Sequence, residues 1–132
     1  MEIDWLAVVL GTVSTFVLGF IWYNPKVFGK AWQKAAGISD EEMNNTSGMA
    51  KIFGTSFVLT FIMALMLSYF IHEDADMSSA IRHALYIGLG IVTMALGVNA
   101  MYERKGFAYI IINGGYQTAS IVIIAVILTV MR

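Results

Sequence analysis

The side chains best suited to specific chemistry lie in the second half of the chain. Asn99 and Glu103 are four residues apart, and Asn113 is closely followed by Tyr116 and Gln117. Residues four apart share one face of a helix, so Asn99 and Glu103 should point the same way. Amide, carboxyl and phenol groups offer hydrogen-bond donors and acceptors. Such a set could brace two helices, bind a lipid headgroup or a small solute, or act in catalysis.

An aromatic and basic segment supplies two further candidates. Trp22 stands beside Tyr23, just before Asn24 and Pro25, and Lys30 follows on a lysine-rich stretch. The remaining polar groups in the apolar runs are single hydroxyls, which offer less specificity. We predict one binding site and assign no catalytic residue. Its members are Asn99, Glu103, Asn113, Tyr116, Trp22 and Lys30.

Several classes of chemistry find no support in the sequence. The chain has no cysteine, which excludes disulfides and thiolate metal sites. It also lacks a glycine-rich phosphate loop and a nucleophile paired with a base. His72, Glu73, Asp74, Asp76 and His83 match no metal-ligand spacing, and we interpret this segment as a solvated acidic loop. A net charge of -1 provides no basic face for nucleic acid. We expect no cofactor, no metal and no nucleic-acid partner.

The composition indicates a membrane protein. Hydrophobic residues make up 58% of the 132 residues and charged residues 13%. A soluble domain of this size has too much surface to bury so many apolar side chains. Four runs carry no Asp, Glu, Lys or Arg: 5–25, 52–72, 83–102 and 106–131. Each reaches the length of roughly 20 residues that a helix needs to cross the hydrocarbon core.

The charge-free runs predict an all-α fold, an integral membrane four-helix bundle forming a single domain over residues 1–132. We place the spans at about 5–23, 52–71, 84–102 and 107–131. The tight turn at 103–106 makes the third and fourth spans antiparallel, so Asn99 should lie level with Asn113. An unpaired amide in lipid costs a few kcal/mol. We therefore expect these two groups to face each other or a wet cavity.

Residues 26–51 are expected to lie in the cytoplasm. Lys26, Lys30 and Lys34 recur every four residues and predict an amphipathic helix over Lys26–Ala36, lying on the membrane. Gly37 should end this helix. Ser39 and Glu42 form a capping box for a second short helix.

Lysine and arginine predict the orientation. Lys26, Lys30, Lys34, Lys51, Arg104 and Lys105 follow the first and third spans, whereas Arg82 and Arg132 lie on the other side. The positive-inside rule then puts both termini outside and the long loop inside a cell (inner) membrane. Small residues within the spans allow close helix packing, and we expect self-association, most simply as a dimer.

Two stretches resemble a family of small, mostly bacterial membrane proteins known as a domain of unknown function, DUF1761. The first stretch is Trp22-Tyr23-Asn24-Pro25 with Phe28-Gly29-Lys30-Ala31-Trp32. The second is Asn99 to Lys105 followed by Ile112-Asn113-Gly114-Gly115-Tyr116, with Tyr102 in place of the family's Phe and Gly114 in place of its Ala. The resemblance implies four spans and places the motif positions on the cytoplasmic side. It implies no activity.

Three functions stay open from the sequence. The first is a homo-oligomeric binding or structural protein with a polar cluster on the cytoplasmic side, engaging a lipid headgroup or small solute. The second is a pore or facilitator for a small neutral solute, formed between copies. The third is a membrane enzyme acting on a lipid, which would need Glu103 against Tyr116 or Asn113.

Overall fold

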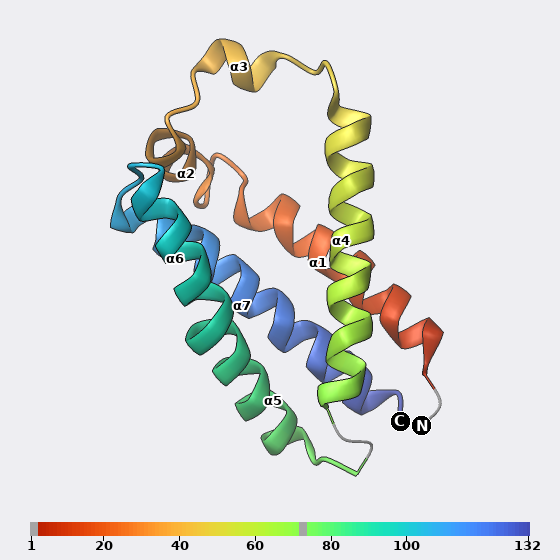
Figure 1. Cartoon of the computed structure of the whole chain (residues 1–132). Coiled ribbons are helices and arrows are strands. Elements are labelled where there is room, and N and C mark those ends of the chain that lie inside the picture. The colour runs from red at the N-terminus through yellow and green to blue at the C-terminus, as the bar shows by residue number, and fades with distance from the viewer. Residues whose placement is uncertain (1–2, 72–73) are drawn as a thin grey trace.

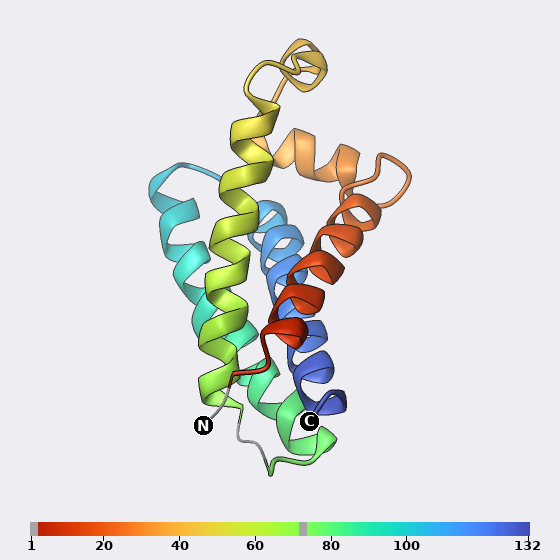
Figure 2. The same ribbon diagram turned by 90° about the vertical axis from the view of Figure 1, so that its right-hand side faces the viewer.

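The computed structural model of the chain describes residues 3–71 and 74–132. Within these ranges the regular structure is entirely helical, and four helical segments are long and apolar enough to cross a membrane. They are α1 (Trp5–Trp22), α4 (Met49–Phe70), the continuous helix of α5 (Met77–Leu85), η1 (Tyr86–Val92) and α6 (Thr93–Tyr102), and α7 (Phe107–Val130). They stand together as a bundle (Figures 1 and 2). The predicted all-α membrane bundle of four spans is confirmed.

The two ends of the bundle differ. Both termini lie at one end, which we call the terminal end (Figure 1). The short helices α2 (Gly29–Ala36) and α3 (Asp40–Asn44) lie at the other, together with the turn between α6 and α7. We call this the loop end.

Helix α7 is the centre of the bundle and packs against α1, α2, α4, α5, η1 and α6. It has more buried residues than any other span, and most of them lie in its second half. The core there consists of small and branched apolar side chains from four helices, chiefly Ala7 and Val8, Ala64 and Leu67, Ala80 and Ala84, and Ile121, Ile124, Ala125 and Leu128. These residues all belong to the terminal half of the bundle, which is therefore closely packed and apolar.

Helix α4 packs closely only near the terminal end. Its buried residues are Ala64, Leu67 and Ser68, all in its second half. Arg132 fastens this end, because its guanidinium donates to the carbonyl oxygens of Ile71 at 2.7 Å and Ser68 at 3.1 Å. A cation beside the last carbonyls of a helix also interacts favourably with the negative end of the helix dipole.

Towards the loop end, α4 touches α1 mainly through pairs of aromatic rings. Phe16 and Phe57 have ring centroids 5.7 Å apart, and Phe20 and Phe53 are 6.2 Å apart. Helix α4 diverges from α7 at the loop end (Figure 1).

The third span and α7 approach each other through reciprocal contacts of Gly and Thr. Gly88 lies against Thr118, and Gly114 lies against Thr93. The Thr93 hydroxyl donates to the Gly88 carbonyl at 2.7 Å, an acceptor that also receives the Thr93 N–H at the end of the π-helical segment η1. Small residues allow this proximity where lipid provides no hydrophobic drive between helices.

The helix that contains the third predicted span, about 84–102, starts before it. The helix begins at Met77, because the Asp76 side chain caps it by accepting from the Ser79 N–H at 2.8 Å. Arg82 lies on an exposed face of these first turns, so its charge does not interrupt the helix. A criterion based on charge-free length therefore misses the two turns before Ala84.

The predicted helix over Lys26–Ala36 is also corrected at its start. Val27 N–H and Gly29 N–H both donate to the Asn24 carbonyl, which folds residues 24–28 into a tight turn before α2 begins at Gly29. A side chain at Gly29 would overlap the Tyr23 carbonyl. The predicted ending is confirmed, since Gly37 caps α2 with φ of 72°. The predicted capping box of Ser39 and Glu42 on α3 is confirmed as well.

Replacing Gly114 by alanine should destabilise the bundle. The added methyl group would lie 2.5 Å from Thr93 Cγ2 and 2.8 Å from Thr93 Oγ1. Overpacking of this kind costs about 1–3 kcal/mol. Gly90→Ala is the matched control, because nothing lies within 4 Å of the added carbon and alanine is the better helix former. Thermal unfolding in mild detergent should give a lower Tm for Gly114→Ala only. Equal Tm values would contradict the proposed close contact.

Candidate functional site

The two sequence stretches that carry the polar candidates meet where α1 ends against α7. The Trp22 indole Nε1–H donates to the Ile112 carbonyl at 3.0 Å. The Tyr23 hydroxyl donates to Asn113 Oδ1 at 2.6 Å. These two bonds join segments that are 90 residues apart in the sequence.

Aromatic rings surround this junction. The Tyr23 ring meets Tyr116 edge-on at 5.2 Å and Trp32 of α2 at 5.4 Å, and the Trp22 ring lies 6.5 Å from Tyr116. The Tyr116 hydroxyl donates to the Thr15 carbonyl of α1 at 2.9 Å. We call Trp22, Tyr23, Trp32 and Tyr116 the aromatic cluster. It ties α1, α2 and α7 together near the loop end.

Glycine makes room for the aromatic cluster. A Cβ at Gly115 would lie 3.0 Å from Trp22 Cζ2, and a Cβ at Gly19 would lie 3.2 Å from the Tyr116 hydroxyl oxygen. Both distances are shorter than ordinary van der Waals contact. The indole and the phenol therefore lie directly on the backbones of α7 and α1.

The Tyr23 phenol is neutral at ordinary pH and so retains the proton that it donates to Asn113.

Of the six predicted site residues, the structure brings three together. Trp22, Asn113 and Tyr116 are part-buried at this junction. Lys30 lies on the exposed face of α2. Lys105, which was not predicted, reaches α2 instead and donates from Nζ to the Ala36 carbonyl at 2.6 Å.

The prediction that Asn99 and Glu103 face Asn113 is wrong. Both side chains are exposed, and neither makes a hydrogen bond within residues 3–71 and 74–132. Helix α6 turns Thr93, Gly97 and Ala100 towards α7, with Ile110 side-chain atoms 3.6 Å from the Gly97 Cβ position. The rotation of a helix about its axis then places Asn99 on the opposite face.

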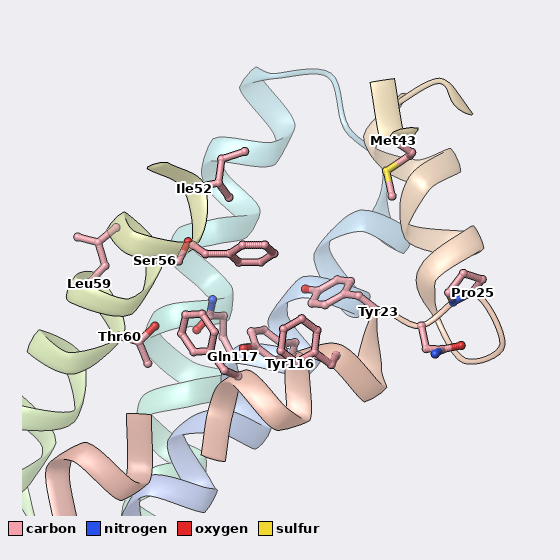
Figure 3. Close-up of a pocket in the computed structure, with 14 residues that line it drawn as sticks. Tyr23, Pro25, Met43, Ile52, Ser56, Leu59, Thr60, Tyr116 and Gln117 are labelled. Carbon is pink, nitrogen blue, oxygen red and sulfur yellow. The ribbon is translucent and has the colours of Figure 1, made fainter. Parts of the chain in front are cut away.

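A cavity of about 640 Å³ opens beside the aromatic cluster, in the space left by the divergence of α4 (Figure 3). It extends from α3 at the loop end to the middle of α4. Its lining comes mainly from three spans: Phe16, Gly19 and Phe20 of α1, Ile52, Phe53, Ser56, Leu59 and Thr60 of α4, Tyr116 and Gln117 of α7, with Tyr23, Asn24, Pro25 and Met43.

Three polar side chains line this cavity without partners of their own. Ser56, Thr60 and Gln117 make no side-chain hydrogen bond to any residue that the structure describes. Hydroxyls elsewhere in the spans, such as those of Thr12 and Thr129, donate to a carbonyl one turn back. The described lining contains no charged side chain. The cavity therefore presents neutral hydrogen-bonding groups among apolar walls.

Sequence reasoning missed Ser56 and Thr60 because each was treated as a single hydroxyl. Their spacing was the available signal, since residues four apart share one helix face. Gln117 was noted beside Tyr116 but was not assigned to the site.

In the predicted acidic loop, the described side chains of Asp76 and His83 make hydrogen bonds with nearby residues of the chain. His72 and Glu73 lie outside the described residues. Asp76 caps α5, and His83 Nδ1 is 2.7 Å from the Ser79 carbonyl oxygen. Over 3–71 and 74–132, no three His, Cys, Asp or Glu side chains are grouped to hold a metal ion.

Comparison with known proteins identifies the family. Residues 6–129 match the family described as "Protein of unknown function (DUF1761)", and the chain belongs to it. No curated protein and no solved structure matches the chain.

The bond between Tyr23 and Asn113 should stabilise the contact between α1 and α7 measurably. In a double-mutant cycle of Tyr23→Phe and Asn113→Leu, the coupling energy should be about 0.5–1.5 kcal/mol, the range found for hydrogen bonds between membrane helices. Tyr102→Phe is the control, because Tyr102 is 85% exposed. Thermal unfolding in mild detergent measures all four variants. A coupling energy of zero would contradict the role of this bond.

Proposed function

We propose that this member of the DUF1761 family is a membrane-embedded binding protein that holds an amphiphilic ligand between α1, α4 and α7. The observation that carries the proposal is the cavity itself, with apolar walls and three neutral polar groups that lack partners. Ligand sites in proteins are typically concave, mostly apolar and roughly 300–1,000 Å³ in volume, with a few well-placed polar groups. A volume of about 640 Å³ falls within that range.

The contrast with the terminal half supports a binding role over a packing defect. Protein interiors are normally close-packed, and Val8, Ala64 and Ile124 in the terminal half are fully buried. The loop half of the same bundle is open, and the cavity lies there between α1, α4 and α7. Cavity and closed core are thus built from the same helices.

The closed terminal half and the positions of Asn113 and Glu103 argue against the two alternative functions. A solute path through one copy would meet the apolar core of the terminal half. A pore between copies would need a polar lining such as a ring of Asn99 and Asn113, and Asn113 Oδ1 already accepts from Tyr23 within the chain. The lipid enzyme was expected to place Glu103 against Tyr116 or Asn113, and Glu103 is exposed.

The predicted site residues take different parts in this proposal. Tyr116 lines the cavity directly. Trp22 and Asn113 hold the wall, through their bonds to Ile112 and Tyr23. Lys30, exposed on α2, is placed to contact lipid headgroups.

We also propose that the protein forms a homo-oligomer, most simply a dimer. The exposed Asn99 amide on α6 supports this, because an amide facing lipid without a partner costs a few kcal/mol. A second copy would supply a partner. Gly54, with open space where a side chain would be, allows a second helix to approach closely.

For the membrane, we propose a cell (inner) membrane with the loop end in the cytoplasm and both termini outside. The support is the six-to-two distribution of lysine and arginine between the two ends. Helix α2 lies across the loop end of the bundle (Figure 2) with Lys30 and Lys34 exposed. This arrangement suits an amphipathic helix at the membrane interface.

Filling the cavity should abolish ligand binding. Wild-type protein purified in mild detergent should retain bound lipid in native mass spectra, and Ser56→Trp should lose it because the indole occupies the cavity. Val58→Trp is the matched control, since Val58 is on the same helix, is 55% exposed and lies outside the lining. Equal lipid retention by the two variants would overturn the proposed function.

The same spectra count protein copies, and monomers in both detergent and nanodiscs would contradict self-association.

Single cysteines should report the orientation without interference, because the chain has none of its own. In intact cells a membrane-impermeant maleimide should label Ala75→Cys. Ser47→Cys and Lys30→Cys should react only after the membrane is permeabilised. Labelling of Ser47→Cys in intact cells would reverse the proposed orientation.

A further inference from the structure

The partnerless polar groups of the cavity lie at the depth where water is scarcest. Thr60 is near the middle of α4 (Met49–Phe70), and Gln117 is near the middle of α7 (Phe107–Val130). Both helices are long enough to span the hydrocarbon core. Polar groups at that depth must find partners within the protein or its ligand. The two side chains line the cavity from different helices, with Ser56 one turn along α4 (Figure 3).

The chemistry of these groups specifies what they bind. The Gln117 amide offers two N–H donors and one carbonyl acceptor, and the hydroxyls of Ser56 and Thr60 each donate and accept. Oxygen-rich heads with ester carbonyls satisfy the donors. The Gln117 carbonyl additionally calls for a hydroxyl on the ligand. A head with both ester carbonyl and hydroxyl groups therefore matches the set.

The absence of charge restricts the ligand further. Among the described residues that line the cavity, none could neutralise a phosphate or carboxylate. Burying an unpaired anion at this depth is strongly unfavourable. A phospholipid could place its phosphate near exposed Lys26 and Lys51 at the loop end. Its acyl chains would then lie against Ser56, Thr60 and Gln117 and leave them without partners.

On the basis of the proposed function, we infer that the ligand is a lipid of the acylglycerol class, with an uncharged head that carries hydroxyl and ester groups. The head binds Ser56, Thr60 and Gln117, and the alkyl part lies against Phe16, Phe20 and Phe53. An uncharged head can also enter the hydrocarbon core from the surrounding bilayer without the desolvation cost of an ion.

Chain-matched lipids test this inference on the wild-type protein alone. Dioleoylglycerol is compared with its methyl ether, which lacks the hydroxyl donor, and with dioleoylphosphatidic acid, which replaces the hydroxyl with a charged phosphate. Titrations followed by native mass spectrometry should give dioleoylglycerol at least about tenfold tighter binding than either analogue, which corresponds to one lost hydrogen bond or more. Equal or tighter binding of dioleoylphosphatidic acid would overturn the inference, and equal binding of the ether would remove the hydroxyl requirement on which it depends.

Matched variants test which side chains bind the head of the ligand. Thr60→Val and Gln117→Leu should each weaken dioleoylglycerol binding about tenfold. Thr129→Val is the control, because the Thr129 hydroxyl donates to Ala125 at 2.8 Å near the terminal end. Equal loss in Thr60→Val and Thr129→Val would overturn the assignment of these contacts. If Ser56→Trp displaces lipid while the three probes bind alike, the binding function stands and the acylglycerol inference fails. If no lipid binds at all, both fail.

Discussion

Without water in the hydrocarbon core, every polar group of a spanning helix must find its partner within the protein or in what the protein binds. Most of this structure follows from that constraint. Trp22, Tyr23 and Tyr116 direct their donors to Ile112, Asn113 and Thr15 on facing helices. Thr93 directs its hydroxyl to Gly88 within the π-helical turn. The first three bonds join α7 to α1 or to the residue that follows it, and the fourth lies within the third span.

The polar groups that remain without partners are as informative as those that are satisfied. Ser120 Oγ is buried and makes no hydrogen bond to the residues that the structure describes. It shares one helix face with Tyr116 and Ile124, so it lies deep in the contact of α1 and α7. Ser56, Thr60 and Gln117 differ from it, because they face an open cavity where a ligand can reach them. Asn99 differs again, because it faces outwards from the bundle.

The two halves of the bundle are packed differently. Near the terminal end, small and branched side chains pack closely around α7, and Arg132 binds carbonyl oxygens at the end of α4. Near the loop end, α1 and α4 meet through the ring pairs Phe16–Phe57 and Phe20–Phe53, while the Tyr23–Trp32 contact and Lys105 hold α2 across the bundle. The bundle is therefore closed at one end and has a cavity towards the other.

The sequence by itself determined the spans, the capping of the short helices and the two segments that meet at the aromatic cluster. These features depend on residues close together in the sequence, such as the length of a charge-free run, Gly37, and the Ser39–Glu42 pair. Such local patterns can be recognised without knowledge of the tertiary structure. The tertiary structure alone decided which face of each helix points inwards. Asn99 turns away from Asn113 because Gly97 and Ala100 provide the close approach to α7. The cavity with Ser56 and Thr60 depends on how α4 is placed against α1 and α7. The α1 and α4 helices meet there through the ring pairs Phe16–Phe57 and Phe20–Phe53, whose members are 41 and 33 positions apart in the sequence.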